Sequence, residues 1–216
     1  MKILDIKNTF SYDLASKEAA LVLFKGGTVV YPTDTLYALG ASALDLNAVR
    51  RIFAVKKRPD KKPLPVMVSS IAMAKEIAFV DDRHEKILNS FWPGPFTFIL
   101  KKKSYVSYLL TAGHNTIALR LPDHPFCQKF MADFERPIVV TSANISGETP
   151  EADPKMIAQR FSRETVQPDL VIDAGGLPEA DPSTIIDLTG SMPKVLRINP
   201  TNKENLMKIL KAMQGQ

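Results

Sequence analysis

Cysteine is nearly absent from this sequence, because Cys127 is the only one among 216 residues. A single cysteine cannot form an intramolecular disulfide, so the fold must depend on its apolar core, and a reducing compartment is expected. Long apolar runs are absent as well. The first residues lack the apolar stretch of a signal peptide, and no later segment reaches the roughly 18 apolar residues of a membrane span. The sequence therefore predicts a soluble cytoplasmic protein with no membrane partner.

Histidine is also scarce. His84, His114 and His124 show no metal-ligand spacing with one another or with Cys127, so we assign no metal site made of protein ligands alone. Cys127 itself lies in an apolar helical pattern, where a packed core thiol is expected rather than a nucleophile.

Common catalytic signatures are missing too. The chain contains no G-x-x-x-x-G-K-[ST] loop, and no G-x-G-x-x-G stands between a strand and a helix. Gly26 and Gly27 follow a predicted helix, whereas the glycines of a P-loop follow a strand, so we interpret them as a helix C-terminal turn. Ser142 lacks the G-x-S-x-G elbow of serine hydrolases. These absences argue against a P-loop enzyme and a serine hydrolase.

The chain has more basic than acidic residues, and its length is that of one globular domain. A net charge of +5 favours anionic partners, and it fits a nucleotide, an RNA backbone or simple solubility equally well. Helical and strand patterns alternate along the sequence. One helix is capped by Asp45 and must end before Pro59, because proline forces the preceding residue toward an extended conformation.

The other elements follow from periodicity, capping residues and turn residues. Further helices are predicted at 13–25, 70–78, 82–90, 124–134 and 154–161, and strands at 28–31, 65–68, 96–101, 116–121, 138–141, 170–173, 184–188 and 194–198. We expect residues 1–200 to form a single α/β domain built on a mixed sheet with flanking helices, and residues 201–216 to form a helix docked on it. The strand order cannot be read from the sequence.

Three polar clusters follow predicted elements, at 31–35, 56–62 and 141–144. Loops at strand ends are where α/β proteins build their sites. Arginine binds phosphate in a bidentate manner, and hydroxyl and amide groups add directional hydrogen bonds. The clusters therefore indicate a phosphate-bearing ligand, with a nucleotide as the natural candidate.

Together these clusters resemble a known family. The stretches are "KGGTVVYPTDTLYALGASA", "KKRPDKKPLPV", "WPGPFTFIL", "TIALRLPDHP", "TSANISG", "PSTIIDLT" and "VLRINP". In this order and register, from about Ala19 to Pro200, they are similar to the YrdC-like family and particularly to its L-threonylcarbamoyladenylate synthases. The resemblance implies a twisted open α/β sheet with a basic concave face.

The implied reaction joins L-threonine, bicarbonate or CO2, and ATP into threonylcarbamoyl-AMP, with release of pyrophosphate. A downstream threonylcarbamoyl-transfer complex would place the group on adenosine 37 of transfer RNA. Mg²⁺ would accompany ATP, held largely by the phosphates and water. Transfer RNA or double-stranded RNA is a further candidate partner.

The same resemblance implies roles for individual residues. The catalytic tetrad would be Lys56, Arg58, Ser142 and Asn144. The ATP-binding residues would be Lys56, Arg58, Lys62, Thr116, Asn144 and Arg197, and the L-threonine-binding residues would be Thr35, Met67, Arg120, Ser142 and Ser183. Fixed cations aimed at the α-phosphate and the departing pyrophosphate lower the barrier to nucleotidyl transfer. Prolines in the cationic loop would limit its reorganisation.

The sequence departs from the family pattern at four positions. Met67 replaces a usual histidine, Lys62 a usual asparagine, Lys57 a usual glycine, and Ala38 the glycine of a turn, the last change being shared with a YciO-like branch. A thioether cannot donate a hydrogen bond, so the amino-acid preference is in question.

Two interpretations of local features stay open, and so does a second function. Asp34 either forms a hydrogen-bonded turn with its neighbours or has a functional role, and Lys101 to Lys103 are interpreted as a solvated strand end rather than an RNA contact. The alternative to a synthase is a YciO-like protein that binds nucleotide or double-stranded RNA without synthase activity.

Overall fold

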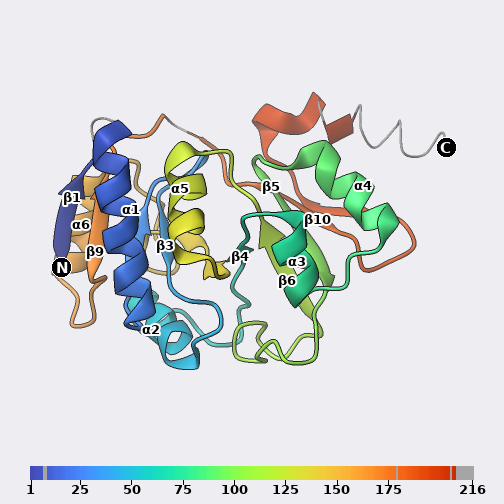
Figure 1. Cartoon of the computed structure of the whole chain (residues 1–216), viewed down its shortest axis with the longest axis horizontal. Coiled ribbons are helices and arrows are strands. Elements are labelled where there is room, and N and C mark those ends of the chain that lie inside the picture. Colours follow the sequence, from blue (N-terminus) through green and yellow to red (C-terminus); the bar gives the residue numbers. More distant parts are fainter. Residues whose placement is uncertain (7–8, 179, 205, 208–216) are drawn as a thin grey trace.

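The computed structural model describes residues 1–6, 9–178, 180–204 and 206–207 (Figure 1). These residues form two mixed sheets and six α-helices. The helices are α1 (Thr9–Phe24), α2 (Leu46–Lys56), α3 (Ile71–Ile77), α4 (Asp82–Phe91), α5 (Pro125–Phe134) and α6 (Pro154–Ser162). No helix in this part of the chain is long and apolar enough to cross a membrane.

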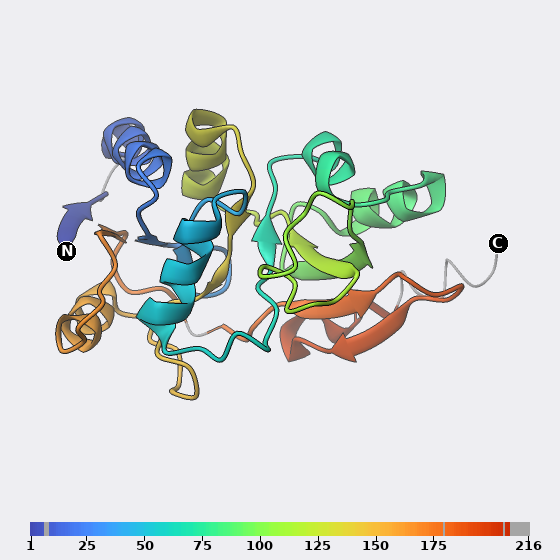
Figure 2. The same ribbon diagram turned by 90° about the horizontal axis from the view of Figure 1, so that it is seen from below.

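The two sheets share no strand. The first has the order β1 (Lys2–Asp5), β9 (Leu170–Asp173), β2 (Val29–Tyr31), β3 (Ala38–Gly40) and β8 (Thr141–Ser142). The second has the order β11 (Lys194–Arg197), β10 (Thr184–Asp187), β5 (Phe96–Lys101), β6 (Thr116–Arg120), β4 (Val66–Met67) and β7 (Ile138–Val139). Seen from below in Figure 2, the two sheets with their helices lie side by side, with β4 between them.

The single α/β domain predicted from the sequence is confirmed, but its strands form two mixed sheets instead of the one we expected. We expected one continuous strand over 138–141, but the segment divides between the two sheets. Ile138 and Val139 pair with β4 of the second sheet, whereas Thr141 and Ser142 pair with β3 of the first. The backbone N–H of Val140, between the two pairs, donates instead to the carbonyl of Pro65. One short segment thereby joins the two sheets.

Helices cover both faces of the first sheet. On one face, α1 and α5 pack side by side over β2 and β9, with Leu23 and Phe130 in the buried cluster (Figure 1). On the other face, α2 and α6 contribute Ile52 and Phe161 to the main core, together with Val171 of β9. Because side chains alternate along a strand, β9 supplies buried residues to both layers.

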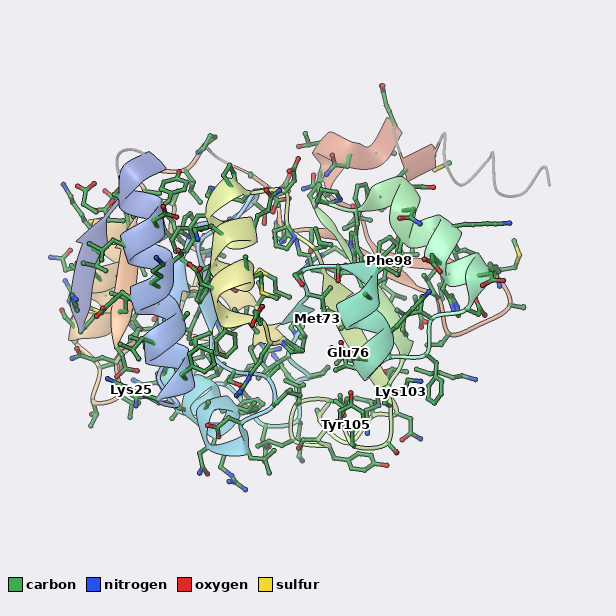
Figure 3. The ribbon with its side chains drawn as sticks, in the orientation of Figure 1. Lys25, Met73, Glu76, Phe98, Lys103 and Tyr105 are labelled. Atoms are coloured by element: carbon green, nitrogen blue, oxygen red, sulfur yellow. The ribbon has the colours of Figure 1, made fainter. Side chains whose placement is uncertain are left out.

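In the described part of the chain, helices cover one face of the second sheet and leave the other without a helix. Leu88 and Phe91 of α4 and Ile77 of α3 pack against residues such as Phe98, all within the main core. Figure 3 shows Phe98 of β5 behind these two helices. The opposite face of β5, β6 and β10 is turned toward the first sheet, where it can line a site.

Capping signals placed the starts of α2 and α6 correctly, whereas α1 begins at Thr9, four residues before the predicted start at residue 13. The side chain of Asp45 accepts hydrogen bonds from Asn47 N and Ala48 N at the start of α2. Ser70 and Asp153 cap α3 and α6 in the same way. Strands β1, β3 and β8 were not predicted as separate strands.

The C-terminal prediction lies mostly outside the described residues, which exclude 205 and 208–216. Within the described part, a short 3₁₀ helix (Pro200–Asn202) is capped by Asn199 rather than by Thr201. Leu206 is fully buried in the main core, so the start of this region packs on the domain.

The run Lys101 to Lys103 is less solvated than expected. Lys102 is only 7% exposed, and its ammonium donates to the carbonyl of Val106. The ammonium of Lys103 lies 4.0 Å from the ring centroid of Phe79. Lys103 and Tyr105 lie at the lower end of α3 in Figure 3, where the Tyr105 hydroxyl donates to the carbonyl of Glu76. Lys102 and Lys103 therefore hold the loop that follows β5.

We expect Gly40→Ala to lower the free energy of unfolding by about 1–3 kcal/mol, as overpacking does in other cores. A Cβ at Gly40 would lie 2.7 Å from both Cε1 of Tyr31 and the carbonyl oxygen of Val139. Denaturant unfolding measures the change. Gly190→Ala is the matched control, because its nearest contact would be an ordinary 3.7 Å. Equal stabilities of the two variants would contradict the close packing of β3.

Candidate functional site

A cavity of about 380 Å³ lies between the two sheets. The first sheet and its loops contribute Thr33, Thr35, Leu36, Tyr37, Ala38, Val140, Thr141 and Ser142, the second contributes Thr97, Ile99, Ala118, Arg120, Pro182, Ser183, Ile185 and Arg197, and two loops add Arg58, Pro63, Pro65 and Pro150. Three arginines and several hydroxyl groups therefore converge on one concave space. This is the basic concave face that the sequence predicts.

Strand alternation explains which side chains line the cavity. On β5, Phe98 and Leu100 point into the core, so Thr97 and Ile99 point into the cavity. On β6, the same alternation turns Arg120 toward the cavity. A hydrogen bond of 2.8 Å links the hydroxyl groups of Thr97 and Ser183 across the floor.

Arg58 and Arg197 are held by neutral acceptors. Arg58 follows the end of α2, and its Nε and Nη2 donate to the carbonyls of Lys62 and Pro63 at 3.3 and 2.9 Å. Arg197 donates to the carbonyl of Ser183 at 2.9 Å and to its hydroxyl at 3.3 Å. Burial lowers the pKa of both guanidinium groups, but the ordinary value is so high that both stay charged.

Arg120 is held by a carboxylate instead. Its Nη2 lies 2.6 Å from Oδ1 of Asp34, and its Nη1 donates to the Thr35 hydroxyl at 2.9 Å. The Thr33 hydroxyl accepts from the backbone N–H groups of Thr35 and Leu36, so it organises the turn that presents these two partners. Asp34 thus belongs to this turn and also pairs with a residue that lines the cavity, and its functional role stays a hypothesis.

Lys56 lies beneath the cavity wall and not in it. The residue is 1% exposed, and its ammonium donates to the carbonyl of Ser142, to the carbonyl of Asn144 at 2.7 Å and to Oδ1 of Asn144 at 3.1 Å. The three N–H donors of the ammonium group thus match these three acceptor oxygens. Burial, and in addition the charge of Arg58, lowers the pKa of Lys56 to about 7. Lys56 therefore fastens the end of α2 to the loop after β8.

Ser142 and Asn144 belong to the same hydrogen-bond network. The Ser142 hydroxyl donates to Oδ1 of Asn144 at 2.6 Å, and Nδ2 of Asn144 donates to the carbonyl of Glu148 at 2.5 Å. Ser142 lines the cavity, whereas Asn144 braces it from behind. The four residues of the predicted tetrad thus come together, with Arg58 and Ser142 in the wall and the other two as its support.

A chain of ion pairs ties the same loops together on the outside. Lys57 pairs with Glu164 at 2.5 Å, and Glu164 also pairs with Nη1 of Arg160 at 2.6 Å. The Nη2 and Nε atoms of Arg160 donate to the two carboxylate oxygens of Glu148 at 2.5 and 2.8 Å. Glu164 is 9% exposed although it receives two cations. Lys57 adopts φ of 49° at the end of α2, a conformation that favours glycine.

Comparison with known proteins places these features in one family. The profile of the Sua5/YciO/YrdC family, described as telomere recombination, matches residues 21–198. The chain belongs to this family.

Its relatives include proteins with different names. A threonylcarbamoyl-AMP synthase of Pyrococcus abyssi is 38% identical over 196 residues, which is 89% of this chain and 56% of that protein. An Escherichia coli protein, the uncharacterized YciO, is 36% identical over 182 residues, 83% of this chain and 86% of that protein. This chain therefore spans about half the length of the first and most of the second.

Solved structures of family members share the fold. The structure of P. abyssi Sua5 complexed with L-threonine has a TM-score of 0.83 at 34% identity, and it covers 92% of this chain and 58% of that one. The structure of E. coli YciO has a TM-score of 0.80 at 32% identity, covering 92% and 95% of the two chains. The fold expected from the YrdC-like resemblance is therefore confirmed.

The cavity gathers six of the residues that the family resemblance singles out: Thr35, Arg58, Arg120, Ser142, Ser183 and Arg197. Lys56 and Asn144 lie directly behind it. Two predicted ATP ligands lie farther out. Lys62 is exposed on the cationic loop, and Thr116 begins β6 two residues before Ala118, the nearest lining residue of that strand.

Met67 lies elsewhere. It is fully buried, belongs to the core beneath α1 and α5, and lines a separate cavity of about 460 Å³ together with Met73, Cys127 and Met131. Met73 is seen on the side of α3 that faces α5 in Figure 3. Cys127 is buried as expected, and burial raises the pKa of its thiol. The cavity lining thus gives no support to the hypothesis that Met67 contacts the amino acid.

The residues predicted for the site from the sequence included neither Thr97, which lines the cavity, nor Asp34, which pairs with Arg120. Thr97 stands between Phe96 and Phe98 in a strand that is otherwise apolar up to Leu100. A lone hydroxyl at that position, on the face opposite to the phenylalanines, was a usable signal. Asp34 gave no such signal, because its partner Arg120 is 86 positions away in the sequence.

No group of three His, Cys, Asp or Glu residues suited to a metal ion occurs in the described part of the chain. The cavity lining offers hydroxyl oxygens, such as that of Ser142, and none of its residues is a carboxylate. This lining fits a magnesium ion that enters with a nucleotide and keeps phosphate and water as its main ligands.

We expect the amine of Lys56 to titrate near pH 7, because burial and the Arg58 charge both disfavour its charged form. The unfolded chain keeps this proton up to about pH 10, so the free energy of unfolding should rise with pH between roughly 7 and 10. Selectively labelled lysine NMR measures the midpoint, and Arg58→Gln should raise it. A Lys56 signal that titrates with the exposed lysines would contradict this assignment.

We also expect Lys57→Gly to be more stable than Lys57→Ala by about 1 kcal/mol. Both variants lose the Glu164 ion pair, but only glycine relieves the positive φ. Thermal and denaturant unfolding compare them directly. If the alanine variant matches the glycine variant, the backbone at this position is not strained.

Proposed function

We propose that this chain synthesises L-threonylcarbamoyl-AMP from L-threonine, bicarbonate or CO2, and ATP, releasing pyrophosphate. The observation that carries the proposal is the three-arginine cavity, in which Arg58 and Arg197 lack a carboxylate partner among the described residues while Arg120 has one. Such a cavity suits a ligand with several phosphate charges at Arg58 and Arg197, next to a ligand carboxylate at Arg120. The names of relatives at 38% and 30% identity, both threonylcarbamoyl-AMP synthases, support it.

Arg58 and Arg197 would bind the phosphates of ATP. Their guanidinium groups keep free N–H donors after the hydrogen bonds to nearby carbonyls, and guanidinium matches phosphate in a bidentate manner. Magnesium would neutralise phosphate charge and help pyrophosphate to leave. A nucleotide-bound HypF structure shares the fold at a TM-score of 0.74 and 23% identity, which supports the fold alone.

Arg120 would bind the threonine carboxylate. Its side chain lines the cavity, and Nη1 and Nη2 each keep a second N–H beside the one engaged with Thr35 or Asp34, so a carboxylate oxygen would accept from them. The hydroxyls of Thr35, Ser142 and Ser183 offer further contacts, as the resemblance implies. This end of the cavity thereby suits a small amino acid.

The chemistry requires these residues to position reactants and to stabilise charge. Bicarbonate would first take up a proton and lose water to give CO2. The free amine of threonine would then attack the carbon of CO2, and loss of a proton from the nitrogen would leave a carbamate. A carbamate oxygen would then attack the α-phosphate, and the bond to pyrophosphate would break. Arg58 and Arg197 face the charge that develops on the phosphates, where fixed cations lower the barrier.

The product would serve a downstream threonylcarbamoyl-transfer complex that modifies adenosine 37 of transfer RNA. A cytoplasmic location, expected from the single cysteine, is part of this proposal. The exposed Lys61 and Lys62 beside the cavity would favour an approaching RNA backbone.

The second candidate function is that of a YciO-like protein that binds nucleotide or double-stranded RNA without synthase activity. The 36% identity with YciO over most of both chains favours it, as does Ala38 in place of the usual glycine. The intact network of Lys56, Ser142 and Asn144 favours the synthase. RNA binding alone would show a steep loss of affinity with salt.

Incubation of the protein with ATP, magnesium, bicarbonate and either threonine, serine or valine separates these functions. We expect mass spectrometry to detect threonylcarbamoyl-AMP and pyrophosphate. Arg58→Gln should reduce turnover by about tenfold or more, as loss of one charge-stabilising donor does elsewhere. Lys61→Gln is the matched control in the same loop, because this lysine is exposed and does not line the cavity. Wild-type protein that binds ATP but makes no product would support the YciO-like function.

A further inference from the structure

Asp34 distinguishes one end of the cavity from the other. Its Oδ1 lies 2.6 Å from Nη2 of Arg120, and the side chains of the pair are only 11% and 8% exposed. Asp34 does not itself line the cavity, so the carboxylate stands behind the guanidinium group. At such burial, solvent screens the pair far less than it screens a surface ion pair.

The positive charges of the other two arginines in the cavity are not neutralised by a carboxylate of the described residues. In the described parts of the chain, Arg58 and Arg197 donate to carbonyl and hydroxyl groups and to no carboxylate. Their positive charge is therefore available to a ligand. Arg120 also carries a positive charge, but Asp34 cancels most of its field at longer range.

The pair keeps hydrogen-bonding capacity for a ligand. Nη1 and Nη2 of Arg120 each carry two N–H groups, and each has one acceptor, the Thr35 hydroxyl and Oδ1 of Asp34 respectively. Because Arg120 lines the cavity, a ligand oxygen there would accept from a remaining N–H of these nitrogens. Nε of Arg120 and Oδ2 of Asp34 are buried without a partner among the described residues, so neither faces the open cavity. A short-range hydrogen bond to Nη1 or Nη2 is little affected by the carboxylate behind the guanidinium group.

We propose that Asp34 is a specificity-determining residue, which acts through Arg120 to make this end of the cavity accept a monoanionic carboxylate and reject a phosphate dianion. The inference rests on the proposed function and deepens it. A dianion would feel about twice the repulsion from Asp34 that a monoanion feels, because Coulomb energy is proportional to charge. Asp34 would thereby keep phosphate groups at Arg58 and Arg197 and leave Arg120 for the amino acid.

The turn around Asp34 supports this positioning role. Thr33 accepts two backbone hydrogen bonds through its hydroxyl, which also donates to the carbonyl of Leu36 at 2.7 Å. The carboxylate of Asp34 and the hydroxyl of Thr35 are thus presented together. Arg120 is held on two sides before any ligand arrives, which reduces the cost of binding.

The test follows the Nε–Hε NMR signal of Arg120 while either inorganic phosphate or L-threonine is added. In wild-type protein, threonine should perturb this signal at lower concentration than phosphate. In Asp34→Asn, which keeps the shape and can still accept a hydrogen bond, the ratio of the phosphate dissociation constant to the threonine dissociation constant should fall about tenfold. The amide spectrum reports whether the variant is folded.

Two controls show that the effect passes through Arg120. Asp169→Asn removes another Asp–Arg pair, with Arg51 at 2.5 Å, which lies outside the cavity. It should leave the ratio within about twofold. Asp34→Glu, which keeps the charge, should keep the ratio close to that of wild type.

The outcomes separate this inference from the proposed function. If threonine perturbs Arg120 in wild type but a folded Asp34→Asn keeps the same ratio, the specificity role is wrong and the proposed function stands. If phosphate perturbs Arg120 of wild type more strongly than threonine does, the specificity role is also wrong, whether or not the variant folds. If threonine does not reach Arg120 at all, the proposed threonine site fails as well.

Discussion

The cavity depends on one constraint, which is that residues 138–142 must pair with both sheets. Ile138 and Val139 extend the second sheet through β4, and Thr141 and Ser142 extend the first through β3. The two sheets therefore meet along this segment and diverge beyond it. Because Ser142 ends the segment, the residue that enters the cavity is positioned by both sheets at once.

Buried positive charge is the second feature that the fold must stabilise. Lys56 has three oxygen acceptors, and Arg120 has a carboxylate and a hydroxyl. Each buried cation is thus compensated in a different way, as burial of charge requires. Lys56 uses its hydrogen bonds to hold a loop, and this use explains why it lies behind the wall. Arg58 and Arg197 remain for a ligand.

The helices were predictable because their signals are local. Asp45, Ser70 and Asp153 lie directly before the helices they cap, and the cap geometry agrees with the sequence pattern. Strands β3 and β8 were missed because they are only three and two residues long. β3 pairs with the nearby β2, but its other partner, β8, lies about a hundred positions away. The division of 138–142 between two sheets has the same cause.

The candidate site shows the same contrast between what local motifs predict and what depends on long-range contacts. Lys56, Arg58, Ser142 and Asn144 could be grouped from motifs, but only the structure shows that two of them act as supports. The contact of Asp34 with Arg120 and the burial of Met67 in the core likewise became visible only in the structure. A residue's position in a motif thus predicts its neighbourhood better than its orientation.

The most direct test of the account is a crystal structure of this protein with L-threonine, magnesium and a non-hydrolysable ATP analogue. We expect the phosphates within hydrogen-bonding distance of Arg58 and Arg197, and the threonine carboxylate within hydrogen-bonding distance of Nη1 or Nη2 of Arg120. Phosphates bound to Arg120, or threonine bound in the separate cavity beside Met67, would contradict it.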